Sequence, residues 1–267
     1  MTFVSDRMRV IKASCVLSVH DTFTVIRPAV WVFLMVVPSL FSMFFFYMIA
    51  GYATGDPDYQ DFVVIGNAVQ AIGMTTIYSV ASIPGDQKHI GTMGSIYMSP
   101  SGLFSIFLGM SLFSILAGFI SVAVSLVFAA FVFGVSMASM NVISVAVVIL
   151  LTAISVGGIS MIIGSVGLYL RTSAILANVF TYLGLILCGV NFPVTDLPGW
   201  AQKIAHCHPL THAVEATRGA VGGSTVTDLA DPILMMILLG IIFAVGSVLT
   251  FRFFEKLSRK KGRLDVF

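Results

Sequence analysis

Four side chains that could bind a metal stand close together late in the sequence: His206, Cys207, His208 and His212. Imidazole and thiolate groups are the ligands that zinc prefers, and His208 and His212 have the i, i+4 spacing of one helix face. Such a cluster would serve a metal-dependent hydrolase or acyltransferase acting inside a membrane. The sequence lacks a His-Glu-x-x-His pattern, however, and Pro209 breaks the stretch in the middle. We therefore favour an interfacial role, in which the histidines cap this break, and we expect no metal.

Glu215 and Arg218, just beyond the histidines, form the one pair of opposite charges at helical spacing in this region. An exposed pair three residues apart contributes only about 0.2–0.5 kcal/mol to a helix. At a membrane boundary the same pair would anchor its segment. The residues alone leave both interpretations open.

Two amides stand one helical turn apart in an apolar run: Asn67 and Gln70, with Met74 and Tyr78 continuing near that face. Polar side chains inside a membrane-spanning run either line a pathway or join neighbouring helices by hydrogen bonds. Because one amide pair is weak evidence for a pathway, we favour the interhelical bonds and keep the pathway as the alternative.

The composition decides which kind of element must position these groups. Hydrophobic residues make up 58% of the 267 residues and charged residues only 10%, which is typical of a membrane protein. The three cysteines, Cys15, Cys188 and Cys207, are too widely spread to predict a disulfide framework. No G-x-x-x-x-G-K-[ST] motif is present, so we expect no ATP site of that kind in this chain.

Hydrophobic runs predict an all-α membrane protein with six transmembrane helices, at residues 29–50, 62–83, 103–133, 142–169, 173–188 and 232–254. Residues 1–28 are too polar to span. Apolar residues recur there at steps of three and four, which predicts an amphipathic helix in the headgroup region: Met8, Ile11, Cys15, Val19, Phe23 and Ile26. The chain thus divides into an interfacial helix (1–28), a transmembrane domain (29–254) and a basic tail (255–267).

Residues 189–223 separate the last two predicted spans and mix polar with apolar side chains. Asp196 stands where the N-cap of a short helix is expected, and Pro209 starts a second helix that ends at Gly222 and Gly223. Each helix would be about 18 Å long, whereas the hydrocarbon core is about 30 Å thick. We therefore predict a re-entrant helical hairpin between spans five and six.

Lysine and arginine residues predict the orientation. One side of the membrane would hold twelve of them: Arg7, Arg9, Lys12, Arg27, Lys88, Arg171, Arg252, Lys256, Arg259, Lys260, Lys261 and Arg263. The other side would hold Lys203 and Arg218. This asymmetry predicts a multi-pass membrane protein with both termini cytoplasmic. The loop at 51–61 and the hairpin would then face outward.

The hairpin region resembles the signature of ABC-2-type exporter permeases, which include membrane subunits for drug and polysaccharide export. The residues that carry the resemblance are Gly189, Phe192, Pro193, Leu197, Pro198, Trp200, Pro209, Leu210, Thr211, Glu215, Arg218 and Gly219. His208 stands where the family more often has Asn. The resemblance implies that this hairpin acts as an outer gate or lateral exit.

The same resemblance implies a cytoplasmic coupling element at residues 84–100, between spans two and three. Six residues would form it: Asp86, Lys88, His89, Gly91, Thr92 and Pro100. The family usually carries more charge here, so this chain departs from the pattern around Gly94 and Ser95. A short coupling helix in this element would dock on an ATPase.

The function that the resemblance implies is that of a permease subunit in a bacterial-type inner membrane, without its own ATP site. A separate ATPase, in two copies, would bind ATP and magnesium, and a second permease, either another copy or a sister chain, would complete the pathway. The substrate would be amphipathic: a drug, a natural product, a lipid or a lipid-linked glycan. The short external loops incline us slightly toward a hydrophobic small molecule or natural product. We expect no nucleic acid partner.

Overall fold

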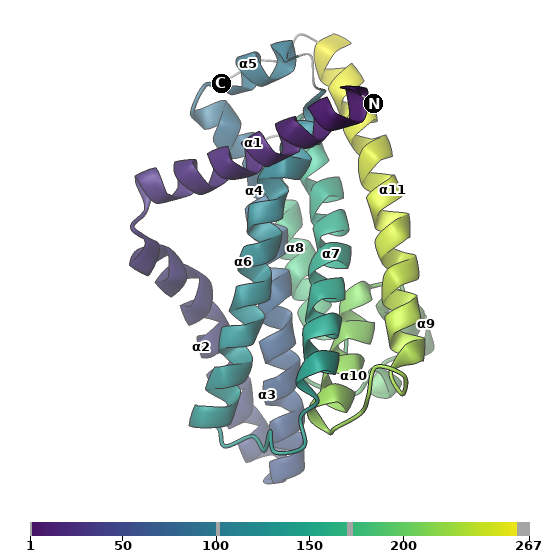
Figure 1. Ribbon diagram of the computed structural model, residues 1–267. Coiled ribbons are helices and arrows are strands. Elements are labelled where there is room, and N and C mark those ends of the chain that lie inside the picture. Colours follow the sequence, from purple (N-terminus) through teal and green to yellow (C-terminus); the bar gives the residue numbers. More distant parts are fainter. Residues whose placement is uncertain (1, 100–101, 170–172, 261–267) are drawn as a thin grey trace.

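The computed structural model describes residues 2–99, 102–169 and 173–260, and every regular element in these ranges is helical (Figure 1). In chain order they are α1 (Thr2–Val25), α2 (Pro28–Thr54), α3 (Pro57–Ile72), a π-helical turn (Gly73–Ile77), α4 (Tyr78–His89), α5 (Met93–Met98), α6 (Leu103–Val132), α7 (Val142–Gly167), α8 (Ser173–Leu187), a 3-10 turn (Val194–Asp196), α9 (Gly199–His206), α10 (Pro209–Val221) and α11 (Ala230–Lys260).

Five segments in the described ranges are long and apolar enough to cross a membrane. They are α2, the continuous rod from α3 through the π turn to α4, α6, α7 and most of α11. The predicted sixth span corresponds to α8, which has only 15 residues and is about 22 Å long. Since that is shorter than a hydrocarbon core of about 30 Å, the prediction of six spans is not confirmed.

The helices form a bundle around the rod of α3 and α4 (Figure 1). In its most apolar stretch this rod is 83% buried, whereas α2 is 17% and α11 only 11% buried. The largest cluster of buried apolar side chains joins α3, α6, α7 and α10, with Ile72, Val122, Val148 and Val214 among its members. Both α2 and α11 therefore offer apolar surfaces to lipid or to a partner chain.

The helix α1 lies across one end of the bundle, where it packs against α6 (Figure 1). The rings of Phe23, Trp31 and Phe113 contact one another where α1 meets α2 and α6. Met8, which the sequence pattern places on the apolar face, is 61% exposed, and Ser14 is buried instead. The single helix at 2–25 agrees with the prediction, while its position in the headgroup region stays a prediction.

Two predicted loops are helical instead. Residues 51–61 contain only a short turn, because α2 continues to Thr54 and α3 begins at Pro57, with Asp56 as its N-cap. The carboxylate of Asp56 accepts a hydrogen bond from the backbone N–H of Asp58 at 3.0 Å. This pairing of an acidic N-cap with proline at the first helical position is a strong helix start, which the hydrophobic pattern did not reveal.

The predicted loop at 84–100 is wrong in its first part. Helix α4 continues through Pro84 to His89, a turn follows, and α5 begins at Met93. Thr92 donates a hydrogen bond to the carbonyl of Gln87 at 3.2 Å and so satisfies a carbonyl at the end of α4. Pro100 and Arg171 lie outside the described residues, as does the tail beyond Lys260.

Candidate functional site

The predicted hairpin consists of two short helices at the end of the bundle opposite α1 (Figure 1). Helix α10 begins at Pro209 and ends at Val221, as the sequence predicts. Helix α9 begins at Gly199 with Pro198 as its N-cap, so the prediction that Asp196 is the cap is wrong. Asp196 ends the preceding 3-10 turn and is exposed. Whether the pair dips into the membrane stays a prediction.

Histidine side chains stabilise the break between the two short helices. His208 is the N-cap of α10, and its Nδ1 accepts a hydrogen bond from the backbone N–H of Leu210 at 3.1 Å. The ring of His212 is 3.0 Å from the carbonyl oxygen of His206 through Nε2. Nε2 of His208 is buried without a partner, and burial lowers the pKa of this side chain to about 4. The predicted capping of the proline break is thereby confirmed for His208.

Arg218 anchors α10 to two other segments. Its guanidinium donates to the carbonyl oxygens of Phe62 (2.8 and 3.2 Å), Gly189 (2.8 Å) and Val190 (2.9 Å). Glu215 is exposed, and none of the described hydrogen bonds of Arg218 goes to it. Of the two interpretations left open, anchoring is the one that the geometry supports, with the arginine acting through backbone carbonyls.

The close packing at this anchor requires a glycine. A Cβ atom on Gly66 of α3 would lie 2.6 Å from Nη2 of Arg218 and 2.9 Å from the carbonyl carbon of Val190. Both distances are shorter than real contacts, so a larger residue would push the segments apart. The start of α3, the segment after α8 and the end of α10 therefore meet at one point.

Asn67 and Gln70 both make interhelical hydrogen bonds. Nδ2 of Asn67 donates to Oδ1 of Asn191 at 2.7 Å, and Ser42 of α2 donates to Oδ1 of Asn67 at 3.1 Å. Nε2 of Gln70 donates to the carbonyl of Thr181 in α8 at 2.9 Å. Both amides are buried, so they join α2, α3 and α8. That they also line a pathway stays a prediction.

The remaining hairpin residues divide into buried and exposed groups. Pro209 is buried, whereas Phe192, Pro193 and Leu197 are half-buried and Pro198 is exposed. The indole of Trp200 is 67% exposed on α9. The apolar side chains that face outward from this end of the bundle are the ones that a gate would use, and the structure leaves that role as a prediction.

The coupling residues lie at the opposite end, on the last turns of α4 and on the turn before α5. Asp86, His89, Gly91 and Thr92 are exposed there. Lys88 differs, because its Nζ donates to the carbonyl oxygens of Gly167 (2.9 Å) and Leu168 (3.0 Å) at the end of α7.

Sequence reasoning missed two exposed apolar side chains at this turn. Ile90 is 60% exposed and Met98 is 83% exposed. We expected a docking element to present charged side chains, whereas these two exposed side chains are apolar. Ile90 precedes Gly91 in the turn and Met98 is the last residue of α5, so this end of the bundle, where α1 lies, carries exposed apolar side chains (Figure 1).

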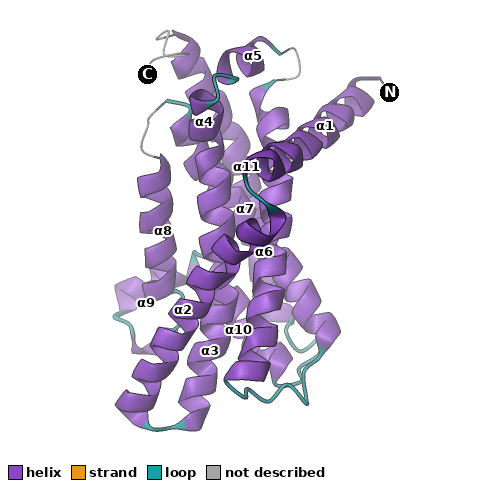
Figure 2. Cartoon of the chain, turned by 90° about the vertical axis from the view of Figure 1, so that its left-hand side faces the viewer, coloured by secondary structure: helices purple, strands orange, loops and turns teal. Residues whose placement is uncertain are grey.

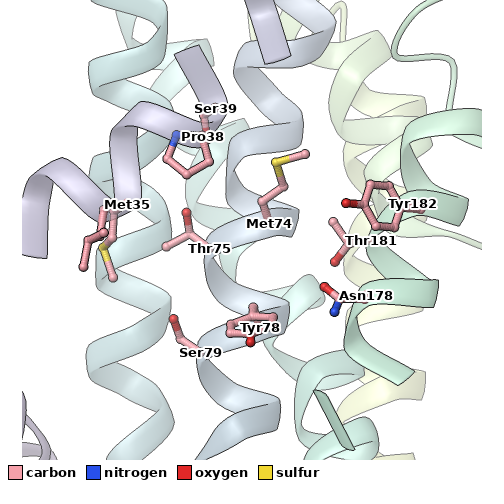
Figure 3. Close-up of a pocket in the computed structure, with 11 residues that line it drawn as sticks. Met35, Pro38, Ser39, Met74, Thr75, Tyr78, Ser79, Asn178, Thr181 and Tyr182 are labelled. Atoms are coloured by element: carbon pink, nitrogen blue, oxygen red, sulfur yellow. The ribbon is translucent and has the colours of Figure 1, made fainter. Parts of the chain in front are cut away.

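The sequence analysis also missed a cavity of about 420 Å³ between α2, the π turn with α4, and α8 (Figure 3). Its lining is uncharged and mixes hydroxyl and amide groups with apolar side chains: Leu34, Met35, Pro38, Ser39, Met74, Thr75, Tyr78, Ser79, Asn178, Thr181 and Tyr182. Figure 2 turns the α2 side toward the viewer, with α8 on the left. The face of Met74 and Tyr78 does reach this cavity, whereas Asn67 and Gln70 are not among its lining residues.

The hydroxyl of Ser39 in this cavity is buried without a protein partner. Ser39 follows Pro38 in α2, its side chain is 2% exposed, and its Oγ makes no hydrogen bond. The neighbouring Thr75 donates to Oγ of Ser121 on α6 at 3.2 Å. Burying a hydroxyl without a hydrogen-bond partner costs about 1–3 kcal/mol of stability. A bound molecule that accepts a hydrogen bond from Ser39 would therefore be stabilised there.

Comparison with known proteins finds a family match over the part of the chain that holds the cavity, the α4–α5 turn and the hairpin. The model of a family described as ABC-2 type transporter matches residues 24–221. The chain is also similar to the daunorubicin resistance ABC transporter permease protein DrrB1 of Streptomyces coeruleorubidus, with 24% identity over 196 residues. The alignment covers 72% of this chain and 68% of that relative. The family match includes the cavity, the α4–α5 turn and the hairpin.

Proposed function

Because the chain belongs to the ABC-2 type transporter family, and is therefore a transmembrane subunit of an ABC transporter, we propose that it is the permease of an exporter for amphipathic molecules. A transporter of this class also contains an ATP-binding subunit. In our proposal that subunit binds ATP and magnesium, and this chain provides the route through the bacterial inner membrane.

The cavity between α2 and α8 is the observation that carries this proposal. Its lining contains hydroxyls of serine, threonine and tyrosine together with the amide of Asn178. Polar groups that face hydrocarbon without partners are unfavourable, so this surface is poorly suited to lipid. Apolar side chains such as Met35 and Met74 lie beside them, and methionine adapts its shape to different ligands. Such a lining fits an uncharged, hydrogen-bonding part of a molecule together with an apolar part.

The same face is the one on which we place a second permease. Helix α2 is only 17% buried in its most apolar stretch and carries the polar cavity residues. Helix α11 is similarly exposed, but its outward side chains, including Leu234, Ile241 and Leu249, are apolar and suit lipid. Pairing through α2 and α8 would bring two cavities together on one pathway, whether the partner is another copy or a sister chain.

The α4–α5 turn is the surface on which we place the ATPase. It lies at the end of the bundle that also holds α1 and the end of α11, where Lys12, Arg252 and Lys256 are exposed (Figure 1). By the charge rule this end is cytoplasmic, so both described ends of the chain would be inside. The hairpin would then lie on the outer side and gate the exit.

A pull-down from gently solubilised native membranes tests this proposal. We expect the tagged chain to recover a soluble subunit with a phosphate-loop motif in roughly equal amount. Replacing Ile90 and Met98 by serine should lower that recovery, because the turn loses its apolar contacts. Phe131→Ser is the matched control. Phe131 is 86% exposed and lies in the last turn of α6, at the end of that helix away from the α4–α5 turn.

The outcomes separate the exporter from the enzyme that the histidines suggested. If the chain is recovered alone and contains zinc, the exporter proposal is wrong. The described contacts favour the exporter, because the ring of His208 caps α10 and the ring of His212 contacts the carbonyl of His206 at the end of α9. Daunorubicin appears in the name of the relative, so it is a suitable first substrate for vesicle uptake assays.

A further inference from the structure

Lys88 connects the end of α4 to the end of α7. Its ammonium donates to the carbonyl oxygens of Gly167 and Leu168, at 2.9 and 3.0 Å. The last carbonyls of a helix have no partner within it and carry partial negative charge, so a lysine is well suited to bind them. The residue lies one turn before the exposed α4–α5 turn, yet its charge points into the protein.

A third helix joins at the same point. Ser258 of α11 donates to the carbonyl oxygen of Leu168 at 3.2 Å, and this hydroxyl is buried. Along the contact between α4 and α7 the backbones approach closely, since a Cβ atom on Gly164 would lie 3.1 Å from the carbonyl oxygen of Val80. The inner ends of α4, α7 and α11 are therefore bonded around the carbonyl of one residue.

Helix α7 leads from this point to the hairpin. It has 26 residues, about 39 Å in length, with no proline inside. At its other end, the N–H of Asn141 donates to the carbonyl of Ala220 at 2.9 Å, and Ser139 donates to the carbonyl of Val221 at 3.2 Å. Both acceptors are in the last turn of α10.

The alternative route along α4 and α3 is less direct. The π turn at Gly73–Ile77 interrupts the α-helical hydrogen bonding between them. The cavity lies beside this turn, so one side of it lacks packed protein atoms. A displacement of α4 is therefore carried better by the unbroken rod of α7 than by its own helix.

We propose that Lys88 is a positioning residue that passes movement of the α4–α5 turn to α7 and α11, and through α7 to the hairpin. The proposal rests on the proposed function, because it needs an ATPase that moves the turn. Lys88 would then act inside this chain and would not form part of the surface that contacts the ATPase.

The test follows Cys207, an exposed cysteine next to the hairpin break, in the assembled transporter. A membrane-impermeant maleimide labels Cys207 with and without ATP and vanadate, in a chain with Cys15 replaced by alanine. We expect the labelling rate to depend on nucleotide in the parent protein and in Lys88→Arg, because arginine can also bind the carbonyls at a helix end. In Lys88→Met the ratio of the two rates should fall to unity while the ATPase still co-purifies.

Two further variants keep the test decisive. Lys256→Met removes an exposed cation at the same end of the molecule and should leave the ratio unchanged. Ser258→Ala removes the second donor to Leu168 and should lower the ratio in part, even if Lys88→Met fails to fold. Retention of the full nucleotide response in Lys88→Met, or its absence in the parent complex, would overturn the inference. Failure to recover an ATPase with the parent chain would instead overturn the proposed function.

Discussion

The guanidinium of Arg218 lies over the ring of Phe62, with Cζ 3.3 Å from the ring centroid, and donates to the carbonyl oxygen of the same residue. The contact combines a cation–π interaction with hydrogen bonds to the start of α3. Since Arg218 also binds Gly189 and Val190, one side chain holds three segments together at the end of the bundle opposite α1.

Arg218→Gln should lower stability by about 3 kcal/mol, because hydrogen bonds from a charged group are lost and several carbonyls are left without their donor. Lysine at this position keeps the charge but cannot bind the carbonyls of three residues in the same geometry, so Arg218→Lys should be intermediate. Thermal unfolding in detergent measures the difference. Glu215→Gln, three residues away and exposed, is the control and should change stability by less than about 0.5 kcal/mol.

Gly66→Ala should destabilise the same region by about 1–3 kcal/mol, because the added Cβ overlaps Arg218 and Val190. Gly85→Ala offers the opposite case on the same rod: no heavy atom lies within 4 Å of the added Cβ, so higher helix propensity should stabilise α4 by up to about 1 kcal/mol. The two unfolding temperatures should thus shift in opposite directions. Equal shifts would contradict the close packing described at Gly66.

The buried ring of His208 should make the folded protein less stable in mild acid. Burial lowers its pKa from 6.5 to about 4 in the folded protein. Between these values the unfolded chain binds more protons than the folded one, so the free energy of unfolding decreases as the pH falls from about 6.5 toward 4. Replacement by asparagine keeps an N-cap and removes the titration, so His208→Asn should unfold with a weaker dependence on pH. Identical pH profiles for the two proteins would contradict this prediction.

Ser39→Ala should weaken substrate binding without lowering the stability of the fold. Its hydroxyl is buried and has no protein partner, so its removal leaves no broken bond. If the substrate bonds to it, the apparent KM for substrate-stimulated ATP hydrolysis should rise about two- to tenfold. Ser125→Ala provides the match, because Ser125 is equally buried and unpaired but does not line the cavity. Equal effects of both changes on KM would argue against a substrate site between α2 and α8.

Local signals in the sequence predicted much of the fold. Helices α6, α7 and α10 begin where expected, at Leu103, Val142 and Pro209. The errors arose where helices continue through polar residues. Hydrophobicity stops at Ile83, yet α4 extends to His89, because its polar last turns are stabilised by Thr92 and by packing against α7.

The site was harder to predict than the helices. The cavity combines residues of α2, α4 and α8, which are far apart in the chain, and no spacing rule connects Ser39 with Asn178. Arg218 was identified from its position in the hairpin, but its carbonyl partners follow only from tertiary packing. The direction of Lys88 likewise depends on where α7 ends, which a pattern within α4 does not contain.

The short turn at residues 55–56 has a consequence for the shape of the transporter. It keeps the Cα atoms of Thr54 and Pro57 within about 11 Å, so these two ends of α2 and α3 cannot separate. The two helices are therefore joined at the end of the bundle opposite α1 (Figure 1). The other end of α2 follows α1 directly, and the cavity residues Leu34 and Met35 are in that half of α2. Any widening of the cavity would therefore come from movement of the α1 end of α2, because its other end is held close to α3.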